Sequence, residues 1–402
     1  MSEIPATSKR SFSLTILPWY TFAHFFHHLC TAIPTPMLVF IRSDYGLNNF
    51  QAVAISAGFS MAYGLGQLPS GWLADKVGRR VFLAVGILGV ALMGILVGFS
   101  NVYTLTLAFL ILMGIAGGGY HPSAAPMISA SVEPKSRGRL LGVHAIGGSS
   151  SFFLAPLIAA AIAAVWGWRA AFFVLAAFTI VFGVLFFWFL RKHLAADRIQ
   201  GTSSGKVVMP QAPTAPGQKR RLIIFLALTV LAGGMTQGIA PTLPLYFVDG
   251  LNLGQAFAAS MVSISSVAGL WAAVAGGYIS DRIGRMPVIF ITFLLGGVII
   301  FLYGRLPWGI GFGALLFFAG VCSYMRMPVA ESFIMGLTTP KNRSTIYGIY
   351  FAVSQEASSA LSLLIGWLTS TYGYIFTFNL SAAVIVGASL VAGIYLWKQG
   401  SN

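Results

Sequence analysis

The chain has 402 residues, of which 57% are hydrophobic and only 8% are charged, and its mean hydropathy is +0.83. Soluble domains carry about 25% charged residues, so this composition excludes a water-soluble protein and predicts an integral membrane protein. The formal net charge of +15 would point to nucleic-acid binding in a soluble chain. In a membrane protein, basic residues in the loops on the cytoplasmic side account for such a charge. No nucleic-acid partner is therefore predicted.

Twelve segments are long and apolar enough for membrane helices, which need about 20 such residues. The predicted spans are 14–41, 52–73, 81–99, 104–131, 140–165, 170–190, 222–247, 256–279, 287–304, 309–335, 345–370 and 375–397. A stretch rich in Gly, Ser, Pro, Gln and Lys separates the sixth from the seventh and is typical of a linker. We therefore expect an all-α membrane protein with a six-helix bundle at 1–190, a linker at 191–221 and a second six-helix bundle at 222–402.

The basic residues are distributed unequally between the two sides of the predicted spans. Of the 24 Lys and Arg residues, Arg42, Arg169 and Arg305 fall on one side, Arg326 lies inside a predicted helix, and the rest fall on the other side. Basic loops remain in the cytoplasm. This pattern predicts that both termini and the linker are cytoplasmic.

A charged turn occurs twice in the sequence. Residues 71–80 read GWLADKVGRR, and residues 277–285, which begin 206 positions later, read GYISDRIGR. Pro122 and Pro328 show the same offset, and so do Pro134-Lys135 and Pro340-Lys341. One offset held across separate segments indicates a duplicated chain, which is typical of secondary transporters.

The first copy of this turn has the form G-x-x-x-D-x-x-G-R-R and resembles the loop signature of the major facilitator superfamily. The residues that carry the resemblance are Gly71, Asp75, Gly78, Arg79 and Arg80, echoed by Gly277, Asp281, Gly284 and Arg285. The second copy departs from the pattern at Met286. The resemblance covers the whole chain and implies the major facilitator fold, with two pseudo-symmetric halves that rock about a central site.

The same resemblance implies that the nine residues of the two turns form a gate on the cytoplasmic side. Gly71 and Gly277 would allow helices to approach closely. Asp75 and Asp281 would face helix N-termini of the opposite half, where the helix dipole favours a carboxylate. Arg79 and Arg285 would complete the ion pairs that hold the gate closed.

Two narrower segments resemble fosmidomycin-resistance-type efflux transporters. They are residues 23–28, which read AHFFHH, and residues 117–122, which read GGGYHP. That group carries Asn-Asp where this chain has His27-His28, so its proton site does not transfer directly. In the fifth span, Ser151, Ala155-Pro156, Ala159 and Ala160 follow the family's antiporter motif with the glycines replaced, which favours export.

Polar side chains inside membrane spans are candidates for function, because burying them in hydrocarbon is costly. Substrate contacts are predicted from Arg326, His24, His121, Tyr120 and Tyr324. Proton handling is predicted from His27, His28, Glu331 and Glu356, since imidazoles titrate near physiological pH. Five positions separate Arg326 from Glu331, so an interhelical partner such as Glu356 suits one of the two better.

Metal binding is an alternative use of His24 and His28, whose i, i+4 spacing suits zinc or a similar ion. The spans of the first half contain no carboxylate away from the gate to complete such a site. The sequence therefore predicts no metal site and no cofactor.

The leading hypothesis is a secondary transporter that exports a small anionic or amphiphilic organic solute by alternating access, coupled to protons. The expected setting is the bacterial inner membrane, and the expected state is a monomer. Open alternatives are an uptake symporter or facilitator, a membrane sensor that does not transport, and a metal-ion exporter. An enzyme is not expected, because the sequence has no nucleotide-binding glycine loop and no nucleophile elbow.

Overall fold

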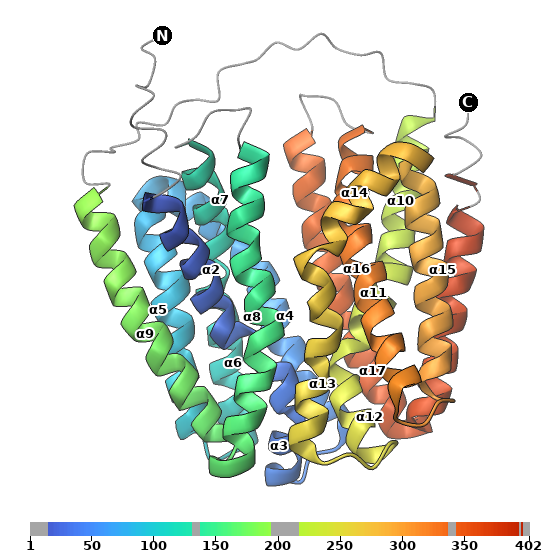
Figure 1. The fold of residues 1–402 in the computed structure, drawn as a ribbon, viewed down its shortest axis with the longest axis horizontal. Helices are drawn as coiled ribbons and strands as arrows, with labels where there is room; N and C mark the ends of the chain where they lie inside the picture. Colours follow the sequence, from blue (N-terminus) through green and yellow to red (C-terminus); the bar gives the residue numbers. More distant parts are fainter. Residues whose placement is uncertain (1–14, 131–136, 194–216, 337–342, 394, 397–402) are drawn as a thin grey trace. The chain divides into compact units, whose positions relative to one another are not determined.

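A computed structural model describes residues 15–130, 137–193, 217–336, 343–393 and 395–396 (Figure 1). Every regular element among these residues is helical. The chain forms two compact units: the first holds the described residues of Met1–Tyr45, Gly58–Ser203 and Gln255–Ser263, and the second those of Gly46–Ala57, Ser204–Gly254 and Ile264–Asn402. Most of the predicted linker, at 194–216, lies outside the described residues, and the predicted domain boundaries stay a prediction.

The described residues of the first half of the chain fold into eight α-helices, which Figure 1 draws in colours from blue to green. They are α2 (Leu17–Thr31), α3 (Pro34–Tyr45), α4 (Asn49–Val77), α5 (Arg79–Phe99), α6 (Tyr103–Gly117), α7 (Tyr120–Ala130), α8 (Arg137–Trp166) and α9 (Trp168–His193). The first turns of α4 belong to the second unit and the rest of it to the first.

The second half consists of α-helices with a few short π-helical or 3-10 segments, which are labelled η. The order is α10 (Gln218–Leu228), η3 (Thr229–Gly233), α11 (Gly234–Gly238), η4 (Ala240–Thr242), α12 (Leu243–Asp249), α13 (Gln255–Val267), η5 (Ala268–Leu270), α14 (Ala272–Ile283), α15 (Arg285–Tyr303), α16 (Ile310–Gly336), α17 (Arg343–Ala388) and η6 (Ser389–Gly393).

Among the described residues, eight helices are long and apolar enough to cross a membrane, or nine if the bent pair α13 and α14 is one span. Two breaks in helices explain part of the difference between this count and the twelve predicted spans. The first predicted span is divided between α2 and α3 just before Pro34, which lacks an N–H for the helix. The range of α17 includes Gly373, whose φ of 82° and ψ of 170° are not helical. The count of twelve stays a prediction.

The break at Gly373 separates two spans rather than bending one. A continuous helix of 46 residues would be about 69 Å long at 1.5 Å per residue. The hydrocarbon core of a bilayer is only about 30 Å thick. The residues on either side of Gly373 therefore correspond to the eleventh and twelfth predicted spans.

The first unit has an apolar core of its own. The helix α2 packs against α8, α9 and α5, and α5 packs along α9; Figure 1 shows α2 in dark blue beside α8 in green. Tyr20, Ile87, Tyr120, Leu140 and Phe186 meet in this core and come from five different helices. Their burial fixes α2 among its neighbours, and α2 carries three of the histidines.

The second unit packs α11 against α17, α15 against α16 and α17, and α14 against α16. Aromatic rings fill the junction of α12 with α15 to α17: the Tyr246 ring lies 5.0 Å from that of Phe378, and the Tyr303 ring lies 5.4 Å from that of Phe312. This core holds α16, which carries Arg326.

The two charged turns have the same backbone conformation. Gly78 joins α4 to α5 with φ 119° and ψ 128°, and Gly284 joins α14 to α15 with φ 91° and ψ 157°. Residues with a Cβ atom rarely adopt a positive φ, whereas glycine adopts it at little cost in energy. The sequence repeat is therefore also a repeat of local structure.

Candidate functional site

Five histidines gather in the first unit. His24, His27 and His28 come from α2, His121 from the start of α7, and His144 from α8. The spacings of three and four residues place the α2 histidines on neighbouring positions of one helix face. His121 is half-buried and the other four are buried.

Two glycines let α8 approach the histidine face of α2. A Cβ atom at Gly147 would clash with the carbonyl oxygen of Thr21, and a Cβ atom at Gly148 would lie 2.6 Å from Cε1 of His24. Any larger residue at position 148 would therefore displace the His24 ring. The close approach of α2 and α8 depends on these small residues, as in other membrane helix pairs.

Backbone carbonyls fix the orientation of two rings. Nδ1 of His24 lies 2.9 Å from the carbonyl oxygen of His144, and Nδ1 of His144 lies 3.0 Å from that of Tyr20. A carbonyl oxygen only accepts, so each Nδ1 carries the proton and each Nε2 has a lone pair when the ring is neutral. Nε2 of His24 is buried and has no hydrogen-bond partner among the described residues.

His27 uses both of its ring nitrogens. Nδ1 donates to the carbonyl oxygen of Gly86 at 2.8 Å, so Nε2 accepts from the Tyr63 hydroxyl at 2.9 Å. The ring also stacks on Tyr120, with centroids 4.3 Å apart and planes at 12°. If Nε2 of His27 took up a proton, the bond to Tyr63 would have to reverse, with the hydroxyl oxygen accepting from Nε2. Its predicted role in proton handling stays a prediction.

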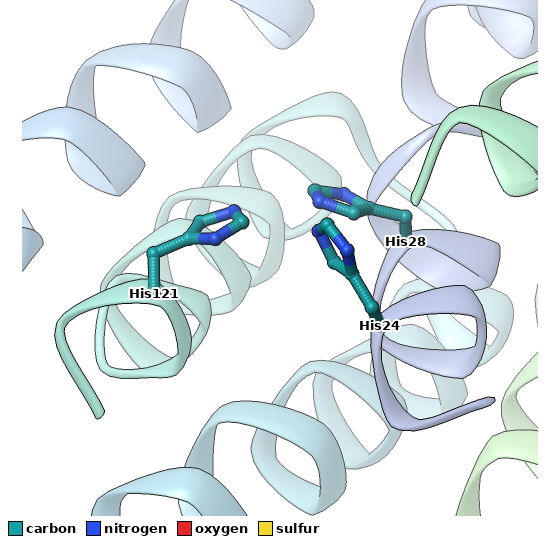
Figure 2. Close-up of side chains that lie close together, drawn as sticks. All are labelled: His24, His28 and His121. Carbon is teal, nitrogen blue, oxygen red and sulfur yellow. The ribbon is translucent and has the colours of Figure 1, made fainter. Parts of the chain in front are cut away.

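Three of the five histidines, His24, His28 and His121, form a compact group. Nδ1 of His28 lies 2.8 Å from Oγ1 of Thr31. One ring nitrogen from each of His24, His28 and His121 can be chosen so that all three lie within 4.8 Å of one another. Figure 2 shows the three rings turned toward a common point, two from α2 and one from α7. Three imidazoles converging in this way could hold a metal ion.

Tyr120 lies behind this group. Its side chain is fully buried in the apolar core of the first unit, and its hydroxyl is 3.5 Å from the carbonyl oxygen of Tyr20. It contacts the rings of His24 and His27 by stacking. The structure thus gives Tyr120 a role in positioning the imidazoles, and its predicted contact with substrate stays a prediction.

Arg326 is the buried cation of the second unit, and 7% of its surface is exposed. Its guanidinium carbon lies 4.1 Å from the centroid of the Phe293 ring, a cation–π contact between α16 and α15. Nη1 of Arg326 has no hydrogen-bond partner among the described residues, and the same is true of the buried Oε1 of Glu356. The proposed pairing of these two residues therefore does not use these atoms.

Two further predicted residues lie on α16. Glu331 is half-buried. Tyr324 packs at the break between α13 and α14: a Cβ atom at Gly269 would lie 2.8 Å from its ring, and its hydroxyl bonds to Ser266. The site predictions for both residues stay untested.

The gate residues are partly described. A Cβ atom at Gly71 would meet only Pro122, at 3.6 Å, and one at Gly277 would meet no heavy atom of the described chain within 4 Å. Neither glycine is required for packing at these distances. The side chain of Asp75 is not among those described. The ion-pair lock between the halves stays a prediction.

Sequence reasoning assigned no role to Tyr63, His144, Gly148 or Phe293. Each contacts a predicted site residue from a different helix, so no spacing within one segment could reveal it. For metal binding the sequence offered only His24 and His28. His121, the third member, is 93 positions after His28, and only the packing of α7 on α2 brings it near.

Comparison with known proteins identifies the family. The model of the Major Facilitator Superfamily matches residues 20–254 and 225–402. The multidrug resistance protein MdtG of Salmonella arizonae is 26% identical over 412 aligned positions, which cover 99% of this chain and 97% of that protein. MdtG of Salmonella typhimurium is 25% identical with the same coverage.

Solved structures show the same fold. A bacterial homolog of the human lysosomal transporter Spinster, in an inward-facing and occupied conformation, aligns with a TM-score of 0.77 at 15% identity and covers 99% of this chain and 98% of its own. A POT family transporter in complex with 5-aminolevulinic acid aligns with a TM-score of 0.78 at 14% identity, covering 95% and 96%. The chain is a multi-pass membrane transporter and not an enzyme, and it belongs to the Major Facilitator Superfamily.

Proposed function

We propose that the protein exports a small anionic or amphiphilic organic solute by alternating access, coupled to protons. The observation that carries the choice of solute is Arg326, a buried guanidinium whose Nη1 has no hydrogen-bond partner in the described chain. A charge inside a membrane protein is costly and is usually retained for function. A carboxylate or phosphonate could accept from Nη1, while Phe293 offers an apolar surface beside it.

The outward direction is supported by the relatives. The two Salmonella proteins are named for multidrug resistance, and a resistance transporter removes its solute from the cell. The small residues Ala155, Ala159 and Ala160 in α8 are buried, as helix packing in an antiporter motif requires. In this proposal the termini are cytoplasmic, the membrane is the bacterial inner membrane, and the protein acts as a monomer.

Carboxyl groups of the second unit are the proposed route for protons. Oε1 of Glu356 is buried without a hydrogen-bond partner in the described chain, and Glu331 lies on the same helix as Arg326. Burial favours the protonated, neutral form of a carboxyl group, and contact with solvent or solute favours the ionised form. Together with His27 and His28, these groups would release protons inward as solute leaves.

The test is solute flux in proteoliposomes with an imposed pH gradient. Carboxylates and phosphonates should accumulate on the acidic side, against their own gradient, and cationic drugs should not. Glu356→Gln should abolish this accumulation while keeping solute exchange at zero gradient. Flux that is indifferent to the gradient would exclude proton coupling. Flux driven in the direction of proton entry would identify an uptake symporter.

A further inference from the structure

Three histidines of the first unit are arranged as ligands of a candidate metal site, a use of these side chains that goes beyond the proposed export of an organic solute. His24, His28 and His121 can place one ring nitrogen each within 4.8 Å of the other two. Two of these rings come from successive turns of α2, and the third comes from α7, so two helices provide the ligands (Figure 2).

The hydrogen bonds behind the rings prepare them to bind a cation. Nδ1 of His24 donates to the carbonyl oxygen of His144, and Nδ1 of His28 pairs with Thr31. Histidine ligands of metal sites characteristically donate from their second nitrogen, as His24 does to a carbonyl oxygen, which fixes the tautomer and directs the other lone pair at the ion; the Thr31 hydroxyl can accept from His28 in the same way. In His24 that lone pair, on Nε2, is buried without a partner among the described residues. A bound cation would satisfy it.

The ligand set selects a class of metal. Three neutral imidazoles suit divalent ions of the later first transition series, such as Zn²⁺ or Co²⁺, and suit Mg²⁺ or Ca²⁺ poorly. We propose that His24, His28 and His121 bind one such cation, with a fourth position left open. His121 is half-buried, so the open position is the side from which a small anion could reach the ion.

Binding requires only a modest contraction of the group. Nitrogens 2.0–2.1 Å from a tetrahedral zinc lie about 3.3 Å from one another, so the widest separation of 4.8 Å must shorten by roughly 1.5 Å. Rotation of the three side chains about their χ angles would be the expected source of this movement. The inference concerns binding alone and does not depend on which solute the protein carries or in which direction.

The test uses the purified, untagged full-length protein in detergent. A calorimetric titration with Zn²⁺ should show one binding site per chain. Co²⁺ should give the strong visible absorption of a four-coordinate ion, and azide should shift that absorption by entering the fourth position. His121→Gln should weaken Zn²⁺ binding by about 100-fold or more, since even an outer partner of a metal ligand is worth 10–100-fold.

His27→Gln is the matched control. It removes an imidazole from the same face of α2, but one whose nitrogens are already bonded to Gly86 and Tyr63, so the affinity for Zn²⁺ should be retained. His24→Gln should lose binding, and its thermal unfolding without metal shows whether the fold survives. The proposal is overturned if the wild-type protein binds no Zn²⁺, or if His121→Gln binds it as tightly as wild type.

Discussion

Two positions related by the 206-residue repeat lie near each other in both units, but different residue types occupy them in each unit. Tyr120 and Arg326 are 206 positions apart, and so are His144 and Tyr350. In the first unit the Tyr120 and His144 rings are parallel to within 16°, with centroids 6.1 Å apart. In the second unit Arg326 and Tyr350 interact electrostatically. Duplication has preserved which positions meet, while the residues at those positions have diverged.

The two units also differ in the kind of polar group that they hold. The five histidines described above as buried or half-buried are all in the first unit, and residues 222–402 contain no histidine. The intramembrane charges Arg326, Glu331 and Glu356 are all in the second. The first unit thus offers uncharged lone pairs that favour a cation, and the second offers a guanidinium that favours an anion. The two halves thus differ in the chemistry of the polar groups that they hold.

Among the variants that change packing or surface contacts, the largest effect is expected from Gly148→Ala in the first unit. The added Cβ atom would lie 2.6 Å from Cε1 of His24, so the ring must move away from its metal-binding position. We expect about a tenfold loss of Zn²⁺ affinity, as for removal of a group that orients a metal ligand. The free energy of unfolding should fall by only about 1–3 kcal/mol, as for other overpacked sites.

Gly142→Ala is the control for this substitution. It lies on the same helix, α8, and no heavy atom of the described chain is within 4 Å of its Cβ position. Its Zn²⁺ affinity should equal that of wild type. Equal losses in both variants would mean that α8 responds to any added methyl group, and the proposed role of Gly148 in placing His24 would fail.

A smaller effect is expected at a link that both units share. Asp44 accepts from Arg169 at 2.7 Å in the first unit, and Asp249 accepts from Tyr374 at 2.6 Å in the second, each across 125 positions. The first link is a partly exposed ion pair, and such pairs contribute about 0.2–1 kcal/mol. Arg169→Gln should therefore lower thermal stability slightly.

The smallest effect is expected from Tyr374→Phe, which removes an exposed hydrogen bond without removing a charge. Thermal unfolding of the two variants beside wild type ranks the links directly. A larger loss for Tyr374→Phe than for Arg169→Gln would show that charge is not what distinguishes the two units at this position.

Sequence reasoning predicted the fold well because the signals are local. Apolar length marks the spans, and the glycine turns at Gly78 and Gly284 are read directly from the repeated motif. It did not predict the 46° bend between α13 and α14, where Gly269 lies against Tyr324 of α16, because a contact between separate helices leaves no local signal in the sequence. The predicted count of twelve spans therefore stays a prediction, beside the eight or nine found among the described residues.

The candidate site was less predictable. The spacing of His24, His27 and His28 indicates a shared face, but nothing in it distinguishes His27, whose two nitrogens are both bonded, from His24, whose Nε2 has no partner among the described residues. That distinction depends on Gly86 and Tyr63, which come from other helices. Likewise, the sequence shows that Arg326 is a charged residue within a predicted span, but it does not show that its guanidinium contacts the Phe293 ring.

The most direct measurement of the central claim is the affinity of an anionic solute for Arg326→Gln, set beside Arg305→Gln. Arg305 is an exposed arginine of the same half that already bonds to Asn379, so its loss should leave solute affinity unchanged. Arg326→Gln should weaken the binding of a transported carboxylate or phosphonate by at least about tenfold, because hydrogen bonds to charged groups contribute about 1.5–3 kcal/mol. Unchanged affinity in a folded Arg326→Gln protein would contradict the proposal that this guanidinium recognises the solute.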